Sequence, residues 1–198
     1  METRLSKFEI VKQKLDGESG VLLDVGARDR ILEKYLDSSN IAYRSADLIG
    51  QGHDYAIDLE RPTGFPDDEF DFVAALDVLE HVEHTHNALD ELIRITRKRL
   101  FVAIPNMSAL SFRIQFLVSG RISGKYDLGV EHQGDRHRWL TTYSQTADFV
   151  KARAQKRGCS LDVVNILSGY GRIHALLSGM PLPTALRTYT CLFEIIKH

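Results

Sequence analysis

The chain has 198 residues, of which 43% are hydrophobic and 26% are charged. This balance is typical of a soluble globular protein, and the length favours one domain over residues 1–198 with an ample core. The net charge of −2 excludes a general nucleic-acid binder, which would carry a basic excess, so we expect no nucleic-acid partner.

The two cysteines and the hydropathy of the sequence indicate in which cellular compartment the protein works. Cys159 and Cys191 lie far apart in strand-like sequence, which supports neither a disulfide framework nor a zinc site. No apolar run approaches the ~18 residues that a membrane span needs, and no signal peptide opens the sequence. We therefore expect a cytoplasmic protein that does not span a membrane, and the composition disfavours contact with one.

The first half of the sequence predicts alternating helices and strands. After a helix at 5–15, an apolar run around Asp24, a glycine at 26 and a helix at 31–36 indicate a strand, a turn and a helix, as in a nucleotide site. This alternation requires parallel strands joined by right-handed crossovers. The strands are predicted at 21–25, 41–46, 55–59, 70–76 and 100–104.

The second half predicts two helices and two closing strands. Asn87 is the expected N-cap of the first helix, with Asp90 and Arg94 paired on its exposed face. Ser144 is the expected cap of the second helix, which Gly158 ends. Strands at 161–166 and 189–196, with no full helix between them, suit an antiparallel last strand. The fold class is α/β, a Rossmann-like, doubly wound sheet of seven strands, mostly parallel.

Residues 107–135 interrupt this alternation with mixed apolar and basic residues. We interpret the segment as an insertion over the carboxyl ends of the strands, which would form a substrate lid. An ordinary core helix and a weak amphipathic membrane contact remain open as alternatives.

Asp47 closes the predicted second strand. Doubly wound nucleotide-binding folds place an acidic residue about 20 residues after the first turn, where its carboxylate can accept both ribose hydroxyls. A turn aspartate ahead of Gly50 and Gly52 is the alternative interpretation. Together with the strand–glycine–helix pattern, the spacing favours the ribose role.

The turn after the first strand resembles the cofactor loop of class I S-adenosylmethionine (SAM)-dependent methyltransferases. Asp24 and Gly26 match its acidic residue and first glycine, whereas Arg28 and Arg30 stand where that family usually has its second and third glycines. The resemblance extends over residues 20–160.

A second stretch resembles the centre of the small-molecule members of that family. The matching pieces are Asp58-Leu59, Phe70-Asp71-Phe72-Val73 and Leu79-Glu80-His81-Val82, the last of which carries the Leu-Glu-His motif. Their side chains and their spacing match together, which is more specific than a lone glycine motif.

By this resemblance the cofactor is S-adenosylmethionine, and residues at the strand ends bind it. The turn of Asp24, Gly26, Ala27 and Arg28 would approach its methionine and ribose portions, and an arginine there could meet the methionine carboxylate. The resemblance further implies Asp47 at the ribose, Leu48 at the adenine face, Asp58 and Leu59 at the adenine amino group, and Leu76 at the sulfonium.

On the acceptor side the resemblance implies two catalytic candidates, Asp77 and His137. His137 would act as a base or contact the acceptor, because imidazole titrates near neutral pH. Asp77-x-x-Glu80-His81 also resembles a metal-binding Glu-x-x-Glu-His of some ubiquinone-pathway and small-RNA methyltransferases. Since the Glu-His pair recurs in relatives without metal, we expect no metal ion, and we expect His84 and His86 to be solvated.

The function that the sequence predicts is transfer of a methyl group from SAM to a small molecule, a sugar or a glycoconjugate precursor. Because Arg28 and Arg30 replace glycines, a non-catalytic methyltransferase-like scaffold or regulatory partner is the alternative. An NAD-dependent oxidoreductase is disfavoured because Gly-x-Gly-x-x-Gly is absent.

Overall fold

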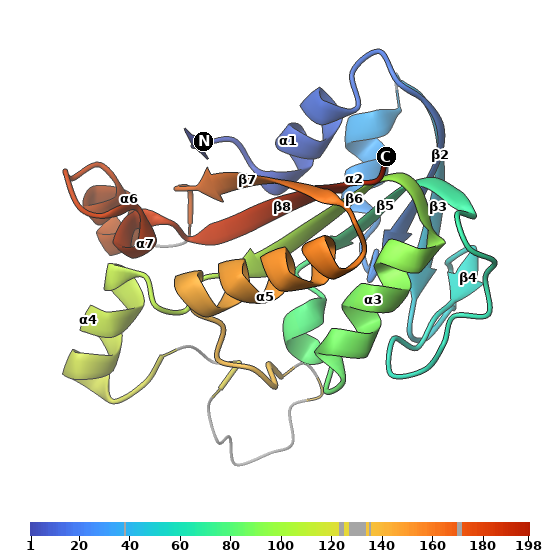
Figure 1. Ribbon diagram of the computed structural model, residues 1–198. Coiled ribbons are helices and arrows are strands. Elements are labelled where there is room, and N and C mark those ends of the chain that lie inside the picture. Colours follow the sequence, from blue (N-terminus) through green and yellow to red (C-terminus); the bar gives the residue numbers. More distant parts are fainter. Residues whose placement is uncertain (38, 123–124, 127–133, 135, 170–171) are drawn as a thin grey trace.

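The chain forms one mixed, twisted sheet (Figure 1). The structure, a computed structural model, describes residues 1–37, 39–122, 125–126, 134, 136–169 and 172–198. Within them the sheet has eight strands in the order β1-β7-β8-β6-β5-β2-β3-β4. Its strands are β1 Glu2–Thr3, β2 Ser19–Val25, β3 Asn40–Asp47, β4 Tyr55–Ala56, β5 Phe70–Leu76, β6 Thr96–Pro105, β7 Ser160–Ile166 and β8 Thr190–Ile196.

Strand directions confirm the predicted Rossmann-like class. The pairs β2–β3, β2–β5, β3–β4, β5–β6 and β1–β7 are parallel, whereas β8 is antiparallel to both β6 and β7. The predicted count of seven becomes eight because the two residues of β1 pair with the outer edge of β7. The strand predicted at 55–59 shortens to β4, which meets only the end of β3.

Helices cover both faces of this sheet (Figure 1). Helices α1 and α2 pack on one face, and α3 and α5 pack on the other. The helices are α1 Lys7–Lys14, α2 Ile31–Leu36, α3 Thr85–Ile95, α4 Leu110–Ser119, α5 Tyr143–Lys156, α6 Arg172–Ser178 and α7 Thr184–Arg187, with a 3-10 helix, η1, at Leu79–His81.

Strand β5 shows why a continuous apolar run marks the centre of such a sheet. Phe72 and Ala74 join the core under α1 and α2, while Val73 and Ala75 join the core under α3 and α5. All four side chains are fully buried, because successive residues point to opposite, covered faces. The strand predicted at 70–76 is confirmed.

The start of α3 differs from the prediction. Its N-cap position is His84, so Asn87 lies inside the helix. A distant loop holds the residues just before the helix, since the Glu60 carboxylate accepts the backbone N–H groups of Glu83 at 2.6 Å and of His84 at 3.1 Å. A carboxylate at a helix N-terminus is also electrostatically favourable.

The predicted pair Asp90–Arg94 is wrong. Asp90 bonds to Arg153 of α5 at 2.6 Å, and Arg94 bonds instead to Glu91 at 2.7 Å and to Asp67 at 2.6 Å. Asp90 therefore takes a tertiary partner, while Arg94 pairs with Glu91 one turn earlier on the same helix and with Asp67 of the preceding loop.

Two further helix predictions have mixed outcomes near the end of the chain. Helix α5 takes Thr142 rather than Ser144 as its N-cap, and Gly158, with φ +68°, follows its last turn as predicted. Between β7 and β8 the short helices α6 and α7 intervene, yet β8 is antiparallel as expected.

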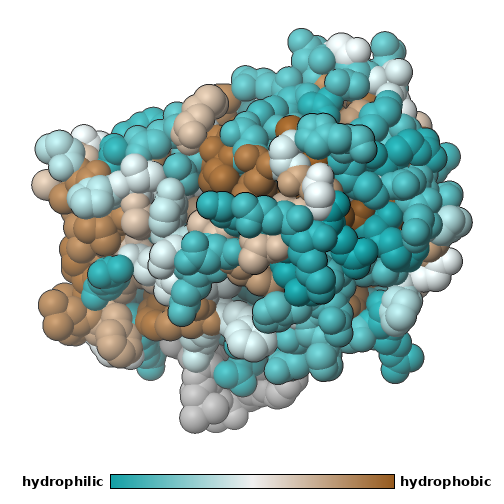
Figure 2. Space-filling view, viewed as in Figure 1, coloured by the Kyte–Doolittle hydropathy of each residue, from teal (hydrophilic) through white to brown (hydrophobic). Residues whose placement is uncertain are grey.

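The described part of the 107–135 segment forms α4. None of its residues is buried, so the ordinary core helix is excluded. It contacts α6 through a 2.9 Å hydrogen bond between Ser111 Oγ and His174 Nδ1. Leu117 and Val118 are 86% and 81% exposed, and Figure 2 shows apolar surface in brown on this side of the molecule. The lid remains a prediction.

Among the described residues, no helix combines the length and the apolar content that crossing a membrane requires.

Candidate functional site

The carboxyl ends of β2, β3, β4 and β5 lie side by side and bring four aspartates to one edge of the sheet. Asp24 pairs in register with residues of both β3 and β5, and Asp47 is the last residue of β3. The Ile57 amide donates to the Asp47 carbonyl at 3.0 Å, which holds Asp58 next to the end of β3. Asp77 directly follows β5.

Asp24 is enclosed, with only 5% of its surface exposed. The Tyr43 hydroxyl donates to its Oδ2 at 2.8 Å. Burial raises the pKa of Asp24 to about 7, and the charge of Asp47 adds to that shift, whereas the Tyr43 hydrogen bond and the charge of Lys7 oppose it. A ligand group that donates a hydrogen bond or carries a positive charge beside this carboxyl would therefore stabilise its ionised form.

The turn after β2 requires glycine at its first position. Gly26 has φ +71°, and a Cβ there would lie 2.5 Å from Val78 Cγ2. The amides of Gly26 and Ala27 both donate to the Ala46 carbonyl, at 2.8 and 3.0 Å. These bonds fix the turn against the end of β3.

Arg28 and Arg30 occupy backbone conformations that glycine usually adopts, with φ +37° and +51°. Such conformations cost a non-glycine residue about 1–2 kcal/mol. The Arg28 amide donates to Asp47 Oδ2 at 3.1 Å. The turn therefore follows the path of a glycine-rich loop although two arginines stand in it.

The Arg30 side chain forms its contacts away from Asp24, Asp47, Asp58 and Asp77. Its guanidinium pairs with Glu33 at 2.7 Å, donates to the Gly52 carbonyl at 3.4 Å and lies 5.7 Å from the centre of the Tyr43 ring. These contacts connect the turn to α2 and to the loop after β3.

Beyond β3 and β4, acidic and apolar groups alternate. Leu48 and Ile49 are 66% and 80% exposed beside Asp47. Asp58 Oδ1 accepts the Glu60 amide at 3.0 Å, while Leu59 is buried in the core. Of the predicted adenine-side residues, Leu48 and Asp58 thus reach the surface and Leu59 packs inward.

Asp77 has a partner that sequence reasoning missed. Lys7, the first residue of α1, forms an ion pair with its Oδ2. Asp77 has φ +61°, and Leu76 before it is buried under α1 and α2. No local signal links Lys7 to Asp77, because the contact depends on how α1 crosses the sheet.

Next to Asp77, the structure places Glu80, His81 and His137 together. The three offer ligand atoms that lie within 4.8 Å of one another, and His137 Nε2 is 3.9 Å from Glu80 Oε1. Glu80 is 1% exposed, and burial, followed by the charge of Asp77, raises its pKa to about 8. His137 was predicted at the acceptor side, but its contact with Glu80 was not.

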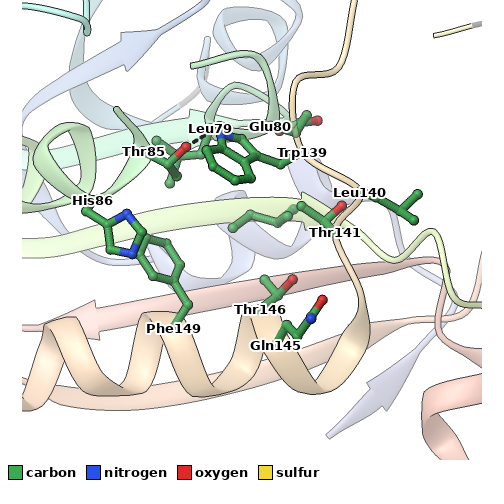
Figure 3. A pocket seen from close by; sticks show the side chains of 11 residues that line it. Leu79, Glu80, Thr85, His86, Trp139, Leu140, Thr141, Gln145, Thr146 and Phe149 are labelled. Atoms are coloured by element: carbon green, nitrogen blue, oxygen red, sulfur yellow. Dashed lines mark hydrogen bonds between the residues drawn. The ribbon is translucent and has the colours of Figure 1, made fainter. Parts of the chain in front are cut away.

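A pocket of about 300 Å³ opens beyond β5, on the side of the sheet that α3 and α5 cover. Figure 3 shows Trp139 and Phe149 facing it, together with Glu80, Thr85 and other residues. The Trp139 indole donates to the Val82 carbonyl at 2.8 Å, which fixes its ring. No sequence pattern indicates this pocket, beyond the expectation that the loop of His137 lies near the acceptor.

Comparison with solved structures shows the same fold in SAM-dependent methyltransferases. One from Thermotoga maritima, described as a possible histamine N-methyltransferase, has a TM-score of 0.60 at 16% identity, covering 99% of this chain and 90% of that one. One from Archaeoglobus fulgidus has a TM-score of 0.59 at 15% identity, covering 98% and 96%.

A third structure contains a bound cofactor product. It is the 1,6-didemethyltoxoflavin-N1-methyltransferase of Burkholderia thailandensis with S-adenosylhomocysteine, with a TM-score of 0.57 at 14% identity, covering 96% of this chain and 76% of that one. No curated protein sequence matches this chain. A family model matches residues 7–157, which include the carboxyl ends of β2, β3, β4 and β5, and the chain therefore belongs to the family described as methionine biosynthesis protein MetW.

Proposed function

We propose that this protein is a SAM-dependent methyltransferase whose acceptor is a small molecule, a sugar or a glycoconjugate precursor. The observation that carries the proposal is the turn after β2. Gly26, Arg28 and Arg30 all have positive φ, and the Arg28 amide bonds to Asp47. A ligand can approach such a turn closely, next to carboxylates at the ends of neighbouring strands.

The residues at the ends of β3 and β4 fit an adenosyl group. Asp47 offers a carboxylate for ribose hydroxyls, and the exposed Leu48 and Ile49 offer an apolar surface for the adenine ring. Asp58 lies next to the end of β3, where its carboxylate would accept a hydrogen bond from the adenine amino group.

The ends of β2 and β5 fit the charges of the methionine portion. The carboxyls of Asp24 and Asp77 suit a cationic sulfonium and its amino group, while Lys7 and Arg28 supply positive charge for its carboxylate.

Bound SAM supplies a methyl group that its sulfonium charge already activates, so the chain mainly has to orient the acceptor and exclude water. We assign the acceptor to the pocket beyond β5, where Trp139 and Phe149 provide aromatic walls. Glu80 lines that pocket, His137 Nε2 lies 3.9 Å from Glu80 Oε1, and the charge of Asp77 acts on Glu80, so we assign both candidates to the acceptor side.

Isothermal titration with SAM and with S-adenosylhomocysteine tests the proposal. We expect saturable binding to the wild-type protein. Asp47→Ala should weaken it about 10- to 100-fold, because it removes hydrogen bonds to a charged acceptor worth about 1.5–3 kcal/mol. Asp148→Asn, an exposed carboxylate on α5, is the matched control and should bind like wild type.

Absence of binding at millimolar SAM would contradict the proposal and would favour the non-catalytic scaffold. Wild-type affinity in Asp47→Ala would show that the cofactor binds elsewhere.

A further inference from the structure

The cluster of Glu80, His81 and His137 has the composition of a metal site. Glu80 and His81 belong to η1, and His137 belongs to the segment that precedes α5. The rings of His81 and His137 meet edge to face, with their centres 4.6 Å apart. It is the one group of three or more such residues found together in the part of the chain that the structure describes.

Glu80 is a buried acid. Its side chain is 1% exposed, and although the charges of Lys7 and Lys125 act on it, neither carboxylate oxygen has a hydrogen-bond partner among the described residues. Asp77, nearby, adds a second acid, and its own ion pair is with Lys7. A buried carboxylate without a donor is costly, and coordination to a cation removes that cost.

Hydrogen bonds at the far side of both imidazoles set their tautomers. His81 Nδ1 lies 3.0 Å from the Arg136 carbonyl oxygen, which can only accept, so this nitrogen carries the proton. His137 Nδ1 lies 3.2 Å from the Tyr126 hydroxyl, which itself donates to the Trp139 carbonyl and therefore accepts from His137. In both neutral rings the lone pair is then on Nε2, the arrangement in which metal-binding histidines are usually held.

We propose that Glu80, His81 and His137 bind a divalent first-row transition-metal ion, such as Zn²⁺ or Mn²⁺. Two imidazoles and one carboxylate suit such ions and leave coordination positions open. Ligand atoms about 2.0–2.2 Å from one tetrahedral ion lie about 3.3–3.6 Å apart, so donors that already lie within 4.8 Å of one another have to approach by at most about 1.5 Å.

Of the three ligands Glu80 also lines the pocket, which places the proposed ion beside it. An oxygen or nitrogen of a molecule held against Trp139 could then complete the coordination. In this assignment His137 acts as a metal ligand and not as a proton acceptor. The inference does not depend on SAM binding, since all three ligands come from outside the turn after β2.

Titration of chelator-treated protein with Co²⁺, followed by visible absorption, tests the site. We expect one equivalent to bind saturably, with ligand-field bands that Zn²⁺ abolishes by competition. His81→Gln and His137→Gln should each weaken binding at least about 10-fold. His86→Gln removes another histidine of the pocket, outside the cluster, and should leave the titration unchanged.

Tyr126→Phe keeps all three ligands and removes only the hydroxyl that orients His137, so we expect binding about 10-fold weaker. Far-UV circular dichroism and thermal unfolding of each variant exclude misfolding as the cause. The proposal is overturned by failure of the wild-type protein to bind millimolar Co²⁺. It is equally overturned if folded His81→Gln and His137→Gln bind as tightly as wild type.

Discussion

The geometry at Gly26 combines two constraints that can be measured separately. Its backbone lies in the left-handed region, and Val78 fills the space where a side chain would begin. Gly17 has almost the same φ, +75°, but nothing lies within 4 Å of the position that a Cβ would take there. The two glycines therefore differ in packing while sharing a conformation.

We predict that Gly17→Ala lowers the free energy of unfolding by about 1–2 kcal/mol, the cost of a left-handed alanine. Gly26→Ala should lose a further 1–3 kcal/mol, approximately the cost of overpacking. Chemical denaturation measures both, and Val78→Ala combined with Gly26→Ala should recover part of the second loss. Equal effects at the two glycines would contradict the close approach of Val78.

Asp24 should give stability a distinctive dependence on pH. Its folded pKa is raised by burial from 3.8 to about 7, so between these values the folded state holds a proton that the unfolded state has released. The contribution of Asp24 to stability therefore falls as the pH rises from 4 to 7. We predict that Asp24→Asn removes this decline, measured by urea unfolding at several pH values with a chelator present. Parallel curves for wild type and variant would show that Asp24 ionises normally.

At the level of elements, Arg94 connects the end of α3 to the loop that leads into β5. It bonds to Glu91, to Asp67 and, at 2.8 Å, to the Phe65 carbonyl. The Arg94 hydrogen bond is the main reason that the pKa of Glu91 falls to about 2. A depressed acid pKa stabilises the fold above the unfolded value of 4.5, and this contribution is lost as the pH falls toward 2.

We predict that Arg94→Ala costs about 1–2 kcal/mol at neutral pH, because it breaks charged hydrogen bonds that are partly screened by solvent. The gap from wild type should narrow when urea unfolding is repeated below pH 4. Arg61→Ala, whose side chain is 82% exposed, should change stability by less than about 0.5 kcal/mol. A gap for Arg94→Ala that stays constant down to pH 2 would rule out the Glu91 pairing as its source.

Elements whose signal is local were predicted well. Strands β2 and β5 are covered on both faces of the sheet, so a continuous apolar run in the sequence predicts where each one lies in the chain. The start of α3 and the length of β4 were wrong. The first depends on Glu60 reaching the helix from an earlier loop, and the second depends on how far the edge strand stays paired. Neither contact can be read from neighbouring residues.

For the whole molecule, topology explains which parts of the candidate site the sequence could predict. Asp24 and Asp47 lie at the carboxyl ends of β2 and β3, Asp58 lies just after β4, and parallel strands bring these ends to one edge. Lys7 beside Asp77, and His137 beside Glu80, join segments far apart in the chain. These pairings arise from the packing of α1 and of the segment before α5, for which the sequence holds no spacing signal.

The central claim is that carboxylates at the ends of β2, β3 and β4 surround one adenosyl site. A crystal structure of the protein with S-adenosylhomocysteine tests it most directly. We predict the ribose hydroxyls on the Asp47 carboxylate, the adenine ring against Leu48 and its amino group near Asp58. A nucleoside bound at another surface would contradict the account. So would crystals grown at saturating ligand that contain no nucleoside because the turn from Gly26 to Arg30 blocks this edge of the sheet.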